Sequence, residues 1–177
     1  MLRAQVNRQA ETDAGRLSEL YVRHAHEAVR LAYLLTGDRS LAEDLVQDAF
    51  VRLAGRFVHL RDPGAFDAYL RRTVVNLSNS YFRRKRVERT HVAQVKGELA
   101  RGDGRSPERS AEDRDELWLA LGRLTRRQRI AIVLRFYEDL PEREIADILK
   151  CRPGTVKSLV SRGLEALRTQ IEVKVDE

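Results

Sequence analysis

Apolar residues recur at helical spacing in two separate blocks of this chain, and no segment shows the alternation of apolar and polar residues that marks a β-strand. The first block runs from about Asp13 to Arg89, and the second covers residues 112–172. Residues 90–111 lie between them and contain glycines and a Ser-Pro pair without sustained apolar periodicity, which is typical of a flexible linker. The sequence therefore predicts an all-α protein with two small helical domains, residues 13–89 and 112–172, joined by a linker.

Turn and capping residues divide the first block into three helices. Gly37 stands at the position where glycine commonly ends a helix. Ser40 and Glu43 have the spacing of a capping box and predict the start of the second helix. Asp62 and Pro63 predict the start of the third, as an N-cap followed by proline at the first helical position. We expect the third helix to turn these residues inward: Phe66, Tyr69, Leu70, Thr73, Val74, Leu77 and Tyr81.

Positive charge is concentrated in one part of the first block. The formal net charge of the chain is +6 and its pI is about 9.8. Between Tyr69 and His91 there are seven arginines and lysines against one glutamate, an excess equal to that of the whole chain. Such a cluster is attracted to polyanions, which are chiefly nucleic acid or an anionic membrane. A solvated basic helix end remains the alternative explanation.

Composition argues against several other classes of protein. The single cysteine, Cys151, cannot form an internal disulfide, and four scattered histidines complete no zinc site. Residues 1–9 lack the apolar stretch of a signal peptide, and no apolar run reaches membrane-spanning length. No Ser/His/Asp set, glycine-rich phosphate loop or close carboxylate pair with a base is evident. We expect a cytoplasmic protein without membrane insertion, catalysis, cofactor, metal or small-molecule substrate.

The segment Glu142–Arg168 has the pattern of a helix-turn-helix. Such a motif needs a short helix with inward apolar residues, a small residue where two helices nearly touch, and a second helix with one polar face. Ala146 is the small residue. The inward residues are predicted to be Ile145, Ile148 and Leu149 in the first helix, and Val156, Val160, Leu164, Leu167 and Ile171 in the second. An ordinary antiparallel helix pair with a solvated face is the alternative.

The turn of this motif contains two unusual residues. Cys151 is expected to fill the turn as a small apolar side chain. Gly154 lies inside the start of the second helix. It either permits close approach of the backbone to DNA or marks a frayed first turn, and the sequence favours neither.

Several motifs together resemble the extracytoplasmic-function group of bacterial sigma factors. Residues 42–50 (AEDLVQDAF) resemble conserved region two, and residues 69–77 (YLRRTVVNL), which run into the basic residues 83–86, resemble its promoter-opening part. Residues 124–129, 144–146 and 154–158 resemble region four. The order of the motifs, the linker and the length also match, so the resemblance covers nearly the whole chain. It implies a detachable subunit with which RNA polymerase recognises and opens particular promoters.

The chain departs from the family pattern at three positions near the turn. Arg152 stands where members commonly have a serine or threonine cap, Leu159 where arginine is frequent, and Lys150 where glycine is frequent. The departures at Arg152 and Leu159 affect which bases the second helix would contact, and the one at Lys150 affects the turn.

An acidic helix face is expected to bind a protein partner. Asp44, Gln47 and Asp48 are spaced i, i+3 and i+4, so they share a face opposite the apolar stripe. An acidic face on a basic protein fits a basic protein surface better than DNA, and the resemblance implies the clamp-helix coiled coil of core RNA polymerase. Ordinary solvated helix polarity is the alternative.

A polar stripe along the third helix is formed by Arg72, Asn76, Asn79 and Arg83. Amide side chains can bond the edges of unpaired bases, while arginines hold the backbone or stack. The resemblance implies that this helix and the preceding loop, residues 58–62, bind the minus-ten element and that one base is flipped near Asn76. Arg83, Arg84 and Arg86 would then grip nearby phosphates. The alternative explanation is that the asparagines are ordinary polar residues on an exposed helix surface, or local caps, with no role in binding.

The second block is expected to bind the minus-thirty-five element as duplex. The contacts predicted there are Arg152, Thr155, Lys157, Ser158 and Arg162. Two other functions stay open: a helix-turn-helix regulator that binds DNA without polymerase, and a protein–protein adaptor. An anti-sigma partner is common in the family that the chain resembles, although no residue of this chain points to one.

Overall fold

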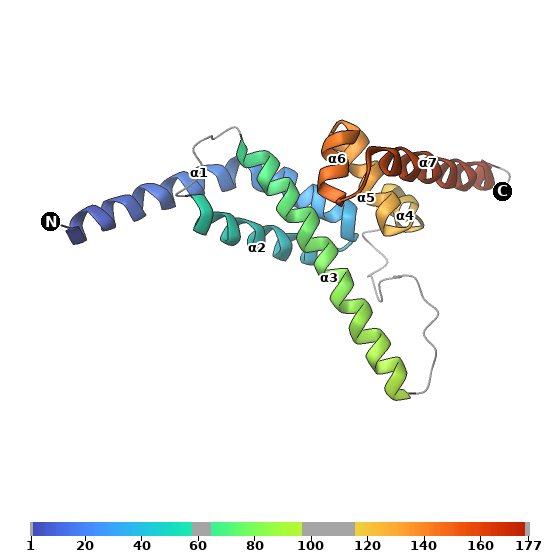
Figure 1. Cartoon of the computed structure of the whole chain (residues 1–177), viewed down its shortest axis with the longest axis horizontal. Coiled ribbons are helices and arrows are strands. Elements are labelled where there is room, and N and C mark those ends of the chain that lie inside the picture. Colours follow the sequence, from blue (N-terminus) through green and yellow to red (C-terminus); the bar gives the residue numbers. More distant parts are fainter. Residues whose placement is uncertain (1, 58–64, 97–115, 176–177) are drawn as a thin grey trace. The chain divides into compact units, whose positions relative to one another are not determined.

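The structure is a computed structural model that describes residues 2–57, 65–96 and 116–175. Every regular element in these ranges is a helix, so the predicted all-α fold class is confirmed (Figure 1). The chain divides into two compact units, Met1–Leu77 and Ser78–Glu177. The predicted linker lies largely outside the described residues, at 97–115.

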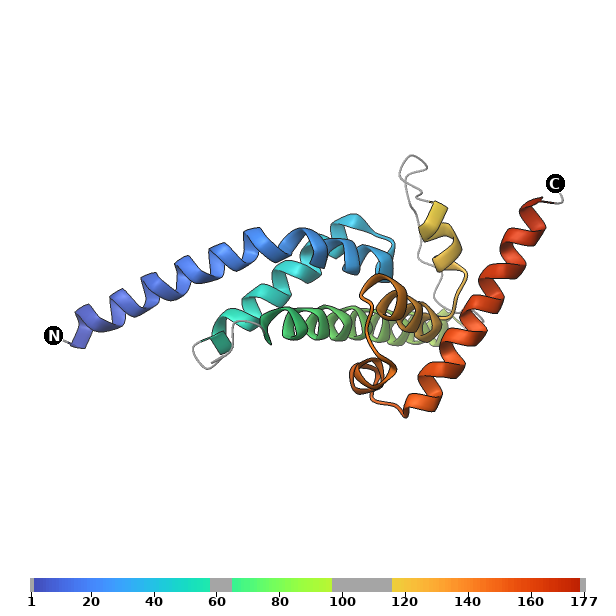
Figure 2. The same cartoon turned by 90° about the horizontal axis from the view of Figure 1, so that it is seen from above.

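Two helices form most of the first unit. α1 spans Leu2–Thr36, so it begins well before Asp13, and α2 spans Arg39–Phe57. In both views α2 folds back along the C-terminal part of α1 (Figures 1 and 2). Their packed faces bury Ala28, Leu31, Ala32, Leu35, Ala42, Leu45, Val46, Ala49, Phe50 and Leu53.

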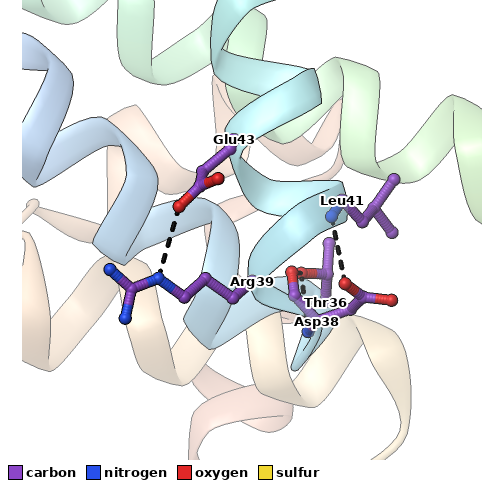
Figure 3. A network of polar contacts seen from close by, with 5 residues as sticks. All are labelled: Thr36, Asp38, Arg39, Leu41 and Glu43. Atoms are coloured by element: carbon purple, nitrogen blue, oxygen red, sulfur yellow. Dashed lines mark hydrogen bonds and ion pairs between the residues drawn. The ribbon is translucent and has the colours of Figure 1, made fainter. Parts of the chain in front are cut away.

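The tight turn between α1 and α2 is stabilised by short polar bonds (Figure 3). Gly37 has a φ of 67°, a conformation that glycine adopts without a steric penalty, and its N–H donates to the Tyr33 carbonyl at 2.6 Å. The buried Thr36 hydroxyl donates to the Ala32 carbonyl at 2.8 Å. α1 therefore ends where the sequence predicted.

The predicted capping box at Ser40 and Glu43 is wrong. The Leu41 N–H donates to Asp38 Oδ1 at 3.0 Å, so the carboxylate of Asp38 caps α2 (Figure 3). Because the helix begins at Arg39, Ser40 already lies within its first turn. Glu43 instead accepts a hydrogen bond from Arg39 Nε at 3.3 Å, one helical turn away.

α3 spans Phe66–Lys96 and packs on the other two helices through its first turn. The ring of Phe66 is almost fully buried, with its centroid 5.4 Å from that of His24 on α1 and 5.7 Å from that of Phe50 on α2. Asp67 accepts from Arg71 at 2.7 Å and lies 3.7 Å from His24 Nδ1. The predicted start at Asp62 and Pro63 lies outside the described residues, and the helix continues past Arg89.

The second unit begins within α3 at Ser78 and contains a cluster of short helices packed against the long helix α7. These are α4 (Glu116–Gly122), α5 (Arg126–Ile132), the π-helix η3 (Val133–Tyr137), α6 (Glu142–Leu149) and α7 (Pro153–Val175). α7 packs against α5 and α6. Thr125 and Gln128, which have the sequence spacing of a capping box, form one at the start of α5. The core contains Leu121, Leu124, Ile130, Ala131, Leu134, Ile145 and Val156.

Gly163 lets α7 approach α5 closely. A Cβ at this buried position would stand 2.5 Å from Ile132 Cδ1 and 3.4 Å from Gln128 Cβ. The contact was not predicted, because the apolar stripe expected for this helix contains the neighbouring Leu164 instead. Leu164 is 44% exposed, so the inward side of α7 at this level is formed by the glycine.

A π-helix turn moves Tyr137 away from the core. The Glu138 N–H donates to the Val133 carbonyl at 3.2 Å, a bond that spans five residues where an α-helix spans four. Tyr137 follows Ile130 and Leu134 at the spacing of an apolar helix face, yet it is 39% exposed. Each hydrogen bond of a π-helix encloses one more residue than a bond of an α-helix does. Tyr137 is therefore rotated about the helix axis, away from the face on which Ile130 and Leu134 lie.

Arg129 is a buried cation that closes the turn between α4 and α5. Its guanidinium donates to the carbonyls of Leu121 at 2.9 Å, Gly122 at 3.3 Å and Leu124 at 3.4 Å. It also lies 5.4 Å from the ring centroid of Trp118. The Leu121 carbonyl also accepts from the Leu124 N–H at 3.2 Å, so Arg129 is a second donor there, and it is a donor to the carbonyls of Gly122 and Leu124 beyond it.

Candidate nucleic-acid and protein interfaces

The acidic face predicted on α2 is present and open to solvent. Asp44, Gln47 and Asp48 are all exposed, while their neighbours Leu45 and Val46 are buried against α1. Within the described part of the chain, neither Asp44 nor Asp48 forms an ion pair. Because the packed side of α2 is fixed by its apolar residues, the acidic face is presented by a rigid helix.

The polar stripe predicted on α3 is exposed along most of its length. Arg72, Asn76 and Arg83 are exposed, and Asn79 is half-buried. The exposed cation Arg84 continues the basic surface beyond it, together with Arg86. Val74, Leu77 and Ser78 are buried on the other sides of the helix, and Val75 is buried beside the stripe. The loop at residues 58–62, which was predicted to share this function, lies outside the described residues.

Tyr69 joins this stripe, although it was predicted to point inward. It is 50% exposed, and Val75, which was not predicted, is buried. Tyr69 precedes Arg72 by three residues and Asn76 by seven, so all three lie on one side of α3. An exposed aromatic ring beside amides and guanidiniums suits stacking on an unpaired base. Aromatic residues usually count as core in a sequence pattern, which is why this one was missed.

The helix-turn-helix pattern is borne out in local geometry. α6 begins and ends at Glu142 and Leu149, and Lys150 adopts the left-handed conformation with φ 51° and ψ 53°. The Cys151 N–H donates to the Ala146 carbonyl at 3.0 Å, and the Thr155 N–H to the Arg152 carbonyl at 2.9 Å. Lys150 thus takes the role that glycine often has at a helix end.

All five predicted duplex contacts are exposed at the start of α7 and on its first turns: Arg152, Thr155, Lys157, Ser158 and Arg162. On the opposite side, Val156 is fully buried, which anchors the helix. The Ser158 hydroxyl donates to the Gly154 carbonyl at 3.0 Å. With its proton engaged inside the helix, this oxygen is left as an acceptor for a donor on a base edge.

Further features bear on other classes of site. Among the described residues, no group of three histidine, cysteine, aspartate or glutamate side chains is placed to hold a metal ion. The helices in that part of the chain also include none with the length and apolar character needed to cross a bilayer.

Comparisons with known proteins agree with this arrangement. The model of Sigma-70 region 2 matches residues 20–88, and the model of Sigma-70, region 4 matches residues 114–167. The RNA polymerase sigma-E factor of Streptomyces avermitilis is 36% identical over 162 residues, covering 87% of this chain and 84% of that protein. The ECF RNA polymerase sigma factor SigW of Bacillus subtilis is 27% identical over 181 residues and covers 97% of each chain.

Solved structures share the fold. The sigma factor RpoE of Bartonella quintana, in complex with the anti-sigma factor NepR, matches with a TM-score of 0.66 at 24% identity, covering 88% of this chain and 96% of that one. CnrH, in complex with the cytosolic domain of CnrY, matches with a TM-score of 0.63 at 21% identity and covers 97% of each chain.

Two helical modules with these matches define a sigma-70-type subunit of RNA polymerase. The chain belongs to the extracytoplasmic-function group of these sigma factors. It directs RNA polymerase to promoters and takes part in the initiation of transcription there.

Proposed function

We propose that three separate surfaces divide the work of this sigma factor. The acidic face of α2, made of Asp44, Gln47 and Asp48, binds core RNA polymerase. The stripe on α3 from Arg72 to Arg83, with Arg84 and Arg86, binds the minus-ten element and holds it open. The first turns of α7 bind the minus-thirty-five element as duplex. The observation that carries this proposal is the exposure of each polar face opposite a buried apolar one.

The chemistry of each surface supports its assignment. Carboxylates repel phosphate, so the α2 face suits a basic protein surface. Amides between arginines suit unpaired bases, whereas hydroxyls and cations at the start of a helix suit a major groove. Two weak DNA contacts, both held by one polymerase, gain from effective concentration, so neither need be tight.

The chain itself is proposed to be non-catalytic and to act in the cytoplasm, where core polymerase and promoter DNA are found. The structurally similar RpoE of Bartonella quintana is in complex with the anti-sigma factor NepR. We propose that an anti-sigma factor also binds this chain and competes with polymerase.

Reconstitution with core polymerase tests the function as a whole. We expect promoter-specific transcripts from a genomic DNA pool when this protein is added to core polymerase, and none with either component by itself. Start-site mapping of the transcripts would give the two promoter elements. Specific duplex binding by the free protein, with no promoter opened in the presence of core polymerase, would favour a polymerase-independent regulator instead.

Replacing Asn76 with alanine is expected to slow promoter opening by about tenfold, the order of one lost base contact. Binding of core polymerase should be unchanged, because Asn76 lies on α3 and the acidic face proposed to bind polymerase lies on α2. The reactivity of unpaired thymines toward permanganate measures promoter opening, and native gels measure how much of the protein is bound to core polymerase.

Thr90→Ala is the control for Asn76→Ala. Thr90 is an exposed polar residue of the same helix, and its hydroxyl is already bonded to the Arg86 carbonyl at 2.9 Å. Equal slowing by both variants would show a general effect on α3 and contradict a base-binding role for Asn76.

A further inference from the structure

Three of the described glycines have a reason inside the protein to be glycine. Gly37 has a positive φ in the turn between α1 and α2. A Cβ on Gly122 would stand 2.7 Å from Trp118 Cζ3, and a Cβ on Gly163 would meet α5. These three positions are accounted for by backbone conformation or close packing.

Gly154 has no such internal reason. It is exposed, its φ is not in the left-handed region, and a Cβ at this position would find no heavy atom within 4 Å. Glycine is a poor helix former, so alanine would serve the fold of this first turn at least as well. The folded chain places no steric demand on Gly154 or on Gly15 of α1, so an external reason for glycine at 154 has to be argued from its place on α7.

The position of Gly154 on α7 indicates what that is. Gly154, Ser158 and Arg162 are spaced i, i+4 and i+8, so they form one line along the exposed side of the helix. Exposed cations flank the line at Arg152 and Lys157. Val156 and Gly163 are buried on the other side of the helix. The glycine therefore belongs to the proposed duplex-binding side of α7.

We propose that Gly154 is a positioning residue for the upstream promoter duplex. The absence of a side chain lets the backbone of the first turn of α7 lie against the DNA. Ser158 and Arg162, farther along the same line, then reach the base edges and phosphates of the groove. A side chain at 154 would hold the whole line away from the duplex. This inference rests on the proposed role of α7, and it decides between the two interpretations of Gly154 that the sequence left open.

Two substitutions of increasing side-chain size test whether the backbone at Gly154 lies close to the DNA. Alanine and leucine are both strong helix formers, so Gly154→Ala and Gly154→Leu should leave the thermal midpoint unchanged or raise it by up to about 4 °C. On a promoter mapped with the wild-type holoenzyme, we expect affinity to fall about tenfold with alanine and further with leucine, the order of one or two lost contacts. Filter binding by the holoenzyme and the thermal midpoint of the free chain are the two measurements.

Gly15→Ala is the matched control. Gly15 is also an exposed helical glycine, and a Cβ there would likewise meet open space, but it lies on α1 in the other unit. It should give a similar or larger gain in stability and leave promoter affinity unchanged. If the Gly154 variants are more stable but bind DNA more weakly, the glycine is needed for close approach to the duplex. If it merely marked a frayed helix end, alanine would stabilise the helix without weakening DNA binding.

Lys157→Ala separates failure of this inference from failure of the proposed role of α7. If Lys157→Ala weakens binding and lessens its salt dependence while Gly154→Leu binds as the wild type does, the clearance role is overturned and the role of α7 stands. If Lys157→Ala and a scrambled minus-thirty-five element both leave affinity unchanged, the role of α7 itself is overturned.

Discussion

Replacing Asp44 with arginine is expected to weaken binding of core RNA polymerase by at least about 30-fold, which is the lower end of the effect of disrupting a charge pair across an interface. Asp44 is exposed on α2 and forms no ion pair within the described part of the chain, so its charge is available to a partner. Reversal of the charge would set an arginine against the basic surface that the acidic face is proposed to bind. Titration of fluorescently labelled protein with core polymerase measures the loss, and promoter-specific transcription should fall with it.

Glu19→Arg is the control for charge reversal. Glu19 is likewise exposed and lies in the same unit, on α1. Its replacement by arginine changes the net charge by the same amount as Asp44→Arg does. We expect the Glu19 variant to bind polymerase as the wild type does. If the two variants lose affinity equally, the effect is one of overall charge, and the acidic face of α2 has no special role. Folding of the Asp44 variant should be intact, since surface substitutions of this kind change stability little.

Replacing Arg129 with methionine is expected to destabilise the second unit by about 3 kcal/mol. Methionine fills much of the same space, but it removes the guanidinium donor from the carbonyls of Gly122 and Leu124 and leaves the Leu121 carbonyl with the Leu124 N–H. Buried acceptors without partners cost about 1–3 kcal/mol each, and relaxation of the turn would recover part of that. For a unit of this size the thermal midpoint should fall by at least about 10 °C.

The matched control is Arg127→Met, two residues earlier on α5. Arg127 is more exposed than Arg129, so its loss should change the midpoint by no more than about 3 °C. Circular dichroism of both variants in parallel gives the comparison. A midpoint for Arg129→Met within that range would show that the bonds to the carbonyls contribute little. A destabilised second unit should also lose upstream promoter binding while polymerase binding through α2 persists.

Local signals predicted much of this fold, and long-range packing accounts for most of the errors. The end of α1 beside Gly37 is as predicted, and the capping box at Thr125 has the spacing that such a box requires. Both follow from residues close in sequence. At the start of α2, Ser40 and Asp38 are both good caps. The choice between them depends on how tightly the turn after Gly37 closes, which sequence spacing does not state.

The exposed faces were easier to predict than the buried ones. Polar residues spaced along α2, α3 and α7 had to face solvent once the apolar residues were packed, and most of them do. Tyr69 and Leu164 were expected inside because their apolar character fits a helical stripe. Leu164 is exposed because its neighbour Gly163 is the residue that faces α5. On α3, Tyr69 is exposed, while Val75, six residues later, is buried.

The π-helix at Val133–Tyr137 has a consequence for how related chains are compared. It contains one surplus residue inside a helix, between the capped start of α5 and the helix-turn-helix. The bonds from Leu140 N–H to the Leu134 carbonyl and from Arg135 to the Leu140 carbonyl, both 3.0 Å, close the segment that follows. A relative one residue shorter at this point could straighten the turn into an α-helix and keep both flanking motifs. Gaps in alignments of this region are therefore best placed inside the helix and not in the loop after it.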